Sequence, residues 1–132
     1  MYIAKRSEKI TAELGLVDES GNIVKTYRVD ADPEILLTRY NRARNDLELA
    51  KLLVEDDFKP EALEAYGRAI VAMMGVFFSE KDVLEILNFY DGNYTEMVVN
   101  ILPFIVDELE PKIDEYSKKR IAELKKRRMV VK

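Results

Sequence analysis

The sequence predicts a mainly α-helical protein in which an N-terminal β-hairpin precedes a bundle of about four helices, the last one long and kinked by proline. Through most of the chain, apolar residues recur every three or four positions, which is the period of an α-helix. Only five glycines and four prolines occur among the 132 residues, a composition that favours helix. This length suits one domain with one core. We expect 1–132 to form that domain, divided into a hairpin arm (1–31), a helical core (32–116) and a basic C-terminal tail (117–132).

Two stretches near the N-terminus predict the hairpin because they alternate apolar with polar or small residues. They cover residues 10–17 and 23–29, and the connection between them contains Gly21 and Asn22, which tolerate positive φ. An isolated hairpin is marginally stable in water, so this one either packs on its own helices or pairs with the edge of another chain. Packing within the chain is the more common arrangement.

The first helix is predicted to begin after Asp32, whose carboxylate can accept hydrogen bonds from the free backbone amides of the first turn. Pro33 has the φ angle that this turn requires, and the helix then runs to about residue 55. An apolar seam along it indicates a partner helix, in the same chain or in another. The seam consists of Leu36, Tyr40, Ala43, Leu47, Ala50 and Val54.

The second helix is predicted to begin at Pro60 and to run to about residue 77. Its C-terminal half is nearly apolar, so this helix should be central. Small residues such as Gly67 would let another helix approach it closely. Met73 and Met74 either fill the core, which is the ordinary role of methionine, or form an adaptable binding surface.

The third predicted helix is short and covers about residues 80–89. Ser79 lies three residues before Asp82, which is a variant of the capping box that opens many helices. Gly92 is expected to end the helix, because glycine readily adopts the left-handed conformation found after helix C-termini.

The last predicted helix is the longest and occupies most of residues 91–126. Pro103 lies about two turns inside it and removes one amide hydrogen bond, so we expect a kink there. Pro111 can introduce a second bend for the same reason. Alternatively, one proline marks a break between two helices. The apolar face of this region consists of Val98, Leu102, Ile105, Leu109, Ile113 and Tyr116.

The composition excludes many kinds of chemistry. There is no Cys and no His, which removes disulfides, thiol nucleophiles, the usual zinc ligands and the commonest general base. Phosphate-binding loops and nucleophile elbows are also missing. An enzyme would have to work with carboxylates, Lys or Tyr alone, and we expect no catalytic, cofactor-binding or metal-binding residues. No apolar run has the length of a signal peptide or a membrane span, so we expect a cytosolic protein with no membrane contact.

Charge is distributed unevenly along the chain. Residues 117–132 contain eight basic residues and one acidic residue, whereas residues 1–116 contain 13 basic and 24 acidic residues. A tail of charge +7 can neutralise phosphates. However, aromatic residues are not interleaved with its basic residues, and a body of charge −11 repels a phosphate backbone. Solvation, or docking on an acidic body or partner, is the more common role of such a tail.

Several segments in the last two thirds of the chain resemble the small tail assembly chaperones of long-tailed bacteriophages and prophages of Gram-positive bacteria. These are residues 64–70 (EAYGRAI), 88–97 (NFYDGNYTEM) and 101–105 (ILPFI), together with Pro111 and Arg120. The resemblance implies a mostly helical protein without enzymatic activity that coats the hydrophobic tape measure protein before the tail tube polymerises. It also implies self-association, because many copies must cover one tape, and the cytoplasm of the bacterial host as the location.

Grooves between helices are our sequence-based hypothesis for the surface that contacts the tape measure protein or a neighbouring copy. An apolar groove on an acidic body would hold such a client and keep the complex soluble. Two other classes stay open: a helical regulator or nucleic-acid-associated protein acting through residues 118–132, and a structural tail or head-completion subunit. The residues expected to line the grooves are Tyr66, Ile70, Met74, Phe89, Tyr90 and Tyr94.

Overall fold

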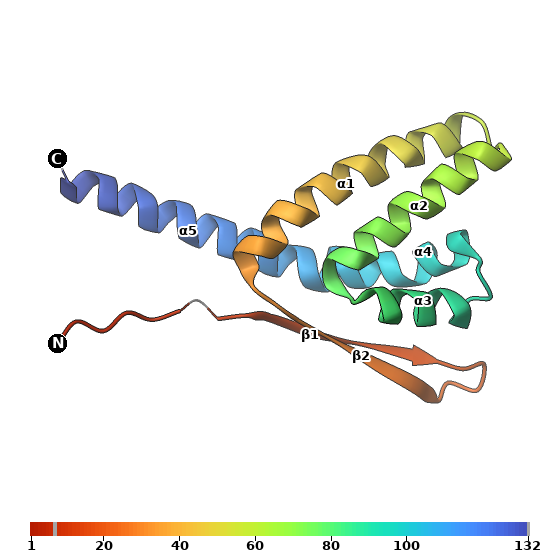
Figure 1. The fold of residues 1–132 in the computed structure, drawn as a ribbon, viewed down its shortest axis with the longest axis horizontal. Coiled ribbons are helices and arrows are strands. Elements are labelled where there is room, and N and C mark those ends of the chain that lie inside the picture. Colours follow the sequence, from red (N-terminus) through yellow and green to blue (C-terminus); the bar gives the residue numbers. More distant parts are fainter. Residues whose placement is uncertain (7, 132) are drawn as a thin grey trace.

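A β-hairpin lies against a stack of helices, as Figure 1 shows for the computed structural model of the chain. The structure describes the backbone of residues 1–6 and 8–131 and side chains as far as Arg127. The prediction of a mainly helical fold with an N-terminal hairpin and a long last helix is confirmed. The elements are β1 (Ile10–Val17), β2 (Ile23–Ala31), α1 (Pro33–Asp56), α2 (Pro60–Phe77), α3 (Glu80–Phe89), α4 (Tyr94–Pro103), the π-helix η1 (Phe104–Leu109) and α5 (Glu110–Val131).

The hairpin packs on the helices of its own chain, which was the more common of the two alternatives. Its strands pair antiparallel, with Ile10 opposite Ala31. The turn is held by Asp18, whose carboxylate accepts hydrogen bonds from the Ser20 and Asn22 amides at 2.9 and 3.0 Å. One face of the sheet is buried against η1 and α2. That face consists of Ile10, Leu14, Leu16, Tyr27 and Val29.

Helices α1 and α2 form an antiparallel helical hairpin (Figure 1), so the partner that the α1 seam indicated lies in the same chain. All of the seam except Val54 is buried, and Val54 is partly buried. Met73 and Met74 are 2% and 1% exposed, which shows that this pair fills the core. Asp32 caps α1 as predicted by accepting hydrogen bonds from the Glu34 and Ile35 amides.

The long C-terminal helix is continuous from α4 through η1 to α5, so neither proline separates two helices. Instead, Pro103 and Pro111 bracket six residues of π-helix, in which the Glu110 amide donates to the Ile105 carbonyl five residues earlier. A proline ring inside an α-helix presses on the carbonyl four residues before it. For Pro111 that residue is Asp107, which lies in η1, where the wider π turn relieves this pressure.

Two buried tyrosines connect neighbouring layers through carboxylates. The Tyr27 hydroxyl on β2 donates to Glu85 on α3 at 2.9 Å, and the Tyr40 hydroxyl on α1 donates to Glu110 on α5. Arg44 also forms an ion pair with Glu110, at 3.5 Å. Each tyrosine buries its ring and satisfies its hydroxyl, which fixes the layers in one arrangement.

The Tyr27 contact predicts a pH dependence of stability. Burial, aided by the hydrogen bond to Glu85, raises the pKa of Tyr27 from 10.0 to about 12. Between these values the unfolded chain loses the phenolic proton while the folded chain keeps it, so stability falls as pH rises through that window. We expect Tyr27→Phe to lose less free energy of unfolding than the wild type between about pH 10 and 12 in urea titrations. Tyr2→Phe, at a side chain 85% exposed, is the control and should follow the wild type; equal slopes for all three proteins would contradict the prediction.

Candidate partner-binding site

Three of the six residues predicted to line a binding groove lie inside the core. Tyr66, Ile70 and Met74 are 8%, 3% and 1% exposed on the inner face of α2. Ile70 and Met74 border an apolar cavity of only about 10 Å³ between α1, α2, α4 and η1. The expectation of an exposed groove along α2 was therefore wrong for these residues, because α1 and α4 both cover this helix.

Tyr94 joins α4 to α2. It is the first residue of α4, and its ring lies against Gly67, where an added Cβ would meet it at 2.6 Å. The expectation that Gly67 permits a close approach is thus confirmed. Tyr94 is only partly buried, but its contact is internal.

The turn between α3 and α4 is built on two residues with positive φ. Asp91 has φ 54° and Gly92 has φ 76°. The Asp91 amide donates to the Asn88 carbonyl and the Gly92 amide donates to the Leu87 carbonyl, both at 3.0 Å, which closes the helix end. Gly92 is left-handed as predicted, and Asp91, directly after the cap residue Tyr90, adopts the same conformation. Aspartate tolerates this conformation better than most residues do.

The remaining two predicted residues, Phe89 and Tyr90, line a groove between this turn and the tip of the β-hairpin. The groove has a volume of about 890 Å³. The two rings meet edge to face with centroids 5.0 Å apart, and Phe89 is 37% exposed. Burial and the nearby Glu96 raise the pKa of Tyr90. We call this feature the acidic groove, since among the described residues that line it there is no Lys or Arg, whereas its carboxylates are Asp18, Glu19, Asp91 and Glu96.

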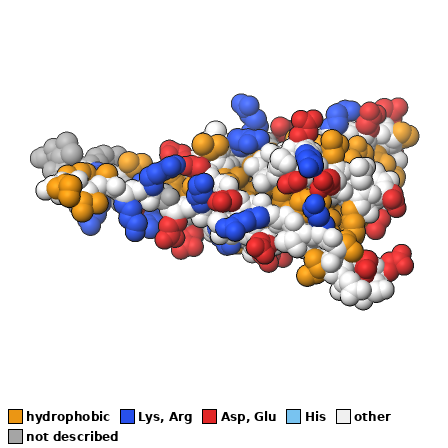
Figure 2. Space-filling view, turned by 60° about the horizontal axis from the view of Figure 1, so that its bottom comes forward, with side chains coloured by type: hydrophobic (Ala, Val, Ile, Leu, Met, Phe, Trp, Pro, Cys, Tyr) orange, Lys and Arg blue, Asp and Glu red, His pale blue; other side chains and the backbone are white. Residues whose placement is uncertain are grey.

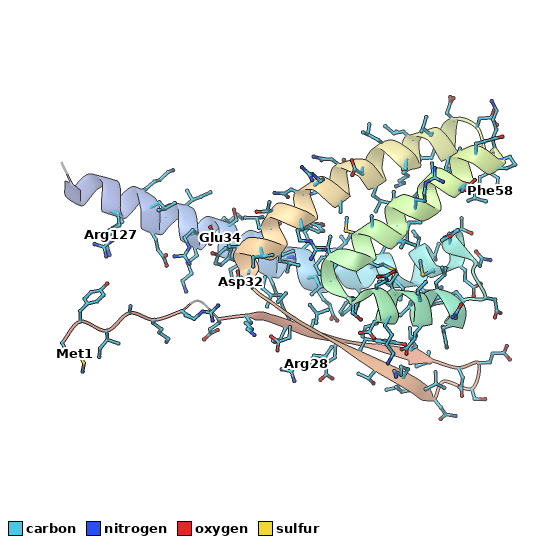
Figure 3. All side chains as sticks on the ribbon, viewed as in Figure 1. Met1, Arg28, Asp32, Glu34, Phe58 and Arg127 are labelled. Atoms are coloured by element: carbon cyan, nitrogen blue, oxygen red, sulfur yellow. The ribbon has the colours of Figure 1, made fainter. Side chains whose placement is uncertain are left out.

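A second surface lies at the tip of the α1–α2 hairpin, which Figure 3 marks with Phe58. Four large apolar side chains are exposed there within ten residues: Leu49 (64%), Leu52 (61%), Leu53 (58%) and Phe58 (67%). We call them the apolar ridge. The three leucines follow the three- and four-residue spacing of one helix face, so they form a continuous stripe. Figure 2 shows hydrophobic side chains among acidic ones at this end of the molecule, opposite the termini.

Sequence reasoning missed the apolar ridge because the distal part of α1 is apolar on two faces. The seam through Leu47, Ala50 and Val54 was sufficient to explain a core-facing helix. A helix packed on one side needs only one apolar stripe. The three leucines outside that stripe, at 49, 52 and 53, could therefore have indicated an exposed apolar surface.

The opposite end of the molecule is basic. A groove of about 560 Å³ separates the N-terminal segment from α5. Its basic lining residues are Lys5, Arg6, Lys9, Lys112, Lys119 and Arg120, and they are interleaved with Glu8, Glu115 and Glu123. Figure 3 places Met1 and Arg127 at this end and Phe58 at the other.

Within residues 1–6 and 8–131, His, Cys, Asp and Glu side chains form no group of three that could hold a metal ion. In the same part of the chain, no helix has the length and apolarity to cross a membrane.

Comparison with family models, curated proteins and solved structures found no match for this chain.

The contact between α2 and α4 can be tested with two glycines of the same helix. Gly67→Ala should destabilise the protein by about 1–3 kcal/mol, because the new methyl group overlaps the Tyr94 ring. Gly75→Ala should be neutral or stabilise by up to about 1 kcal/mol, since nothing lies within 4 Å of its added Cβ and alanine favours helix. Chemical denaturation measures both. Equal effects of the two substitutions would show that Tyr94 does not pack on Gly67.

Proposed function

We propose that this chain is a non-enzymatic assembly chaperone that binds the tape measure protein of a long-tailed bacteriophage and keeps it soluble until the tail tube forms. The observation that carries the proposal is the apolar ridge, which exposes four large apolar side chains on a helical hairpin. Contiguous exposed apolar surface of this kind marks a site for a macromolecular partner. The sequence resemblance at residues 64–70 and 88–97 supports the choice of partner.

The geometry of the ridge suits a helical client. Leu49, Leu52 and Leu53 form a stripe on a helix, and a long apolar helix can lie along such a stripe as one helix packs on another. Phe58 extends the contact beyond the end of α1. Each large apolar side chain that becomes buried contributes about 1.5–3 kcal/mol before the costs of association.

The charges around the ridge suit the same role. Glu48, Glu55, Asp56 and Asp57 flank it and are exposed, and three of them form ion pairs with basic neighbours: Glu48 with Arg44, Glu55 with Lys51 and Asp57 with Lys59. Charged side chains of both signs at the rim of an apolar contact help to keep a complex of many copies soluble. In this proposal the protein acts in the cytoplasm of the bacterial host, and several copies cover one tape measure chain.

Nucleic-acid binding is the second candidate, because the basic groove brings basic residues of the N-terminal segment and α5 to one end of the molecule. Three glutamates in the same lining oppose this role. The two functions differ in their response to salt. Binding to a phosphate backbone weakens steeply as salt increases, whereas apolar client binding does not.

Co-expression with a tape measure segment tests the proposal. Leu52→Glu/Leu53→Glu should reduce the soluble client recovered with the protein by at least about tenfold, because each lost leucine contact exceeds the 1.4 kcal/mol that a tenfold change requires. Thr38→Glu/Asn41→Glu is the matched control, since it adds two carboxylates to exposed positions of α1 at least two turns from the ridge. Circular dichroism establishes that both variants fold. Undiminished client recovery with the ridge variant would contradict the proposal, and salt-sensitive binding to nucleic acid would favour the second candidate.

A further inference from the structure

The C-terminal part of α5 extends beyond the core. Ile113 is 1% exposed, whereas the seven side chains from Ile121 to Arg127 are all exposed. In Figure 1 this part of the helix projects away from the other helices. A helical segment of this length gains little stability from its own hydrogen bonds, and most helices in proteins are stabilised by packing. The exposed end therefore suits docking on another surface.

One face of this end combines apolar and basic side chains. Ile121 and Leu124 are 50% and 63% exposed and lie one turn apart. Lys118 and Lys125 flank them on the same side of the helix, because residues three and four apart share a face. This docking face points away from the basic groove, whose α5 lining includes Lys119 and Glu123 on the other side of the helix.

The acidic groove has the complementary character. It combines an apolar wall, made by Phe89 and Tyr90, with a carboxylate-lined rim. Among the described residues, the groove lining carries four negative charges and no positive one, whereas residues 117–127 of α5 carry six basic residues and one acidic residue. Apolar contact can thus be combined with charge pairing at this surface.

We infer that the end of α5 docks in the acidic groove of a second copy of this chain. The groove lies at the end of the molecule formed by the hairpin turn and the α3–α4 turn, and α5 projects from the opposite end (Figure 1), so a chain cannot fill its own groove. The contact joins two different surfaces, so each copy added leaves one tail and one groove available. Association by this contact is head to tail and extends beyond a dimer. It uses no residue of the apolar ridge, and it is independent of client binding.

Charge reversal on each side of the contact tests the inference in the full-length protein. The tail variant is Lys118→Glu/Lys125→Glu. The groove variant is Glu19→Lys/Glu96→Lys, at two exposed positions that leave the Asp18 turn intact. Combining all four substitutions restores the net charge of −4. Asp46→Lys/Glu108→Lys is the control, because it adds the same charge as the groove variant at exposed positions of α1 and η1.

Light scattering over a range of protein and salt concentrations provides the readout, with circular dichroism to establish folding. We expect the mass of the wild type and the control to grow with concentration and to fall with salt, and each reversal variant alone to remain monomeric. An equimolar mixture of the two variants should associate like the wild type, since the unchanged tail of one variant fits the unchanged groove of the other and the two reversed surfaces also have opposite charges. The fourfold variant should associate again. A wild type that is monomeric throughout, reversal variants that associate like the wild type, or a mixture that remains monomeric would each overturn the inference.

Discussion

The fold depends on one buried stripe along the last helix. Ile105, Leu109 and Ile113 are 2%, 0% and 1% exposed and follow at four-residue intervals through η1 into α5. The hairpin packs on η1, α1 packs on α5, and α2 and α3 pack on α4, so every layer meets this helix. The stripe stays inward through the π-helical segment that lies between the two prolines. Since the helix is longer than the layers that cover it, its basic end emerges from the core.

This arrangement gives the molecule two different ends. The hairpin turn, the α3–α4 turn and the α1–α2 tip lie together at one end, and they carry the acidic groove and the apolar ridge (Figures 1 and 3). The other end carries the N-terminal segment and the basic part of α5. Surfaces of this kind serve binding, and the residues that form them belong to turns and helix tips on a rigid core. The proposed chaperone role uses the apolar ridge. The proposed head-to-tail contact joins the acidic groove of one copy to the basic end of α5 of another.

The sequence predicted local structure better than it predicted surfaces. Side chains that accept hydrogen bonds from their own helix start, such as Asp32 and Ser79, set element boundaries that the structure confirms. Whether an apolar residue faces the core depends on its tertiary neighbours. Met74 was expected in a groove and is buried, while Leu52 lies outside because α1 carries more apolar residues than one interface can cover. The π-helix was likewise not predicted, since the two prolines indicated only a bend or a break in the last helix.

Hydrogen exchange measured by mass spectrometry, on the chain alone and bound to a soluble tape measure segment, tests the central claim that the apolar ridge holds the client. We expect slower amide exchange in peptides covering residues 49–58, where the ridge residues lie on the last turns of α1 and the connection to α2. Exchange across α2 should not change, because its apolar residues already fill the core. Protection confined to α5, or faster exchange across α2 on binding, would show that the client uses another surface and would contradict the account.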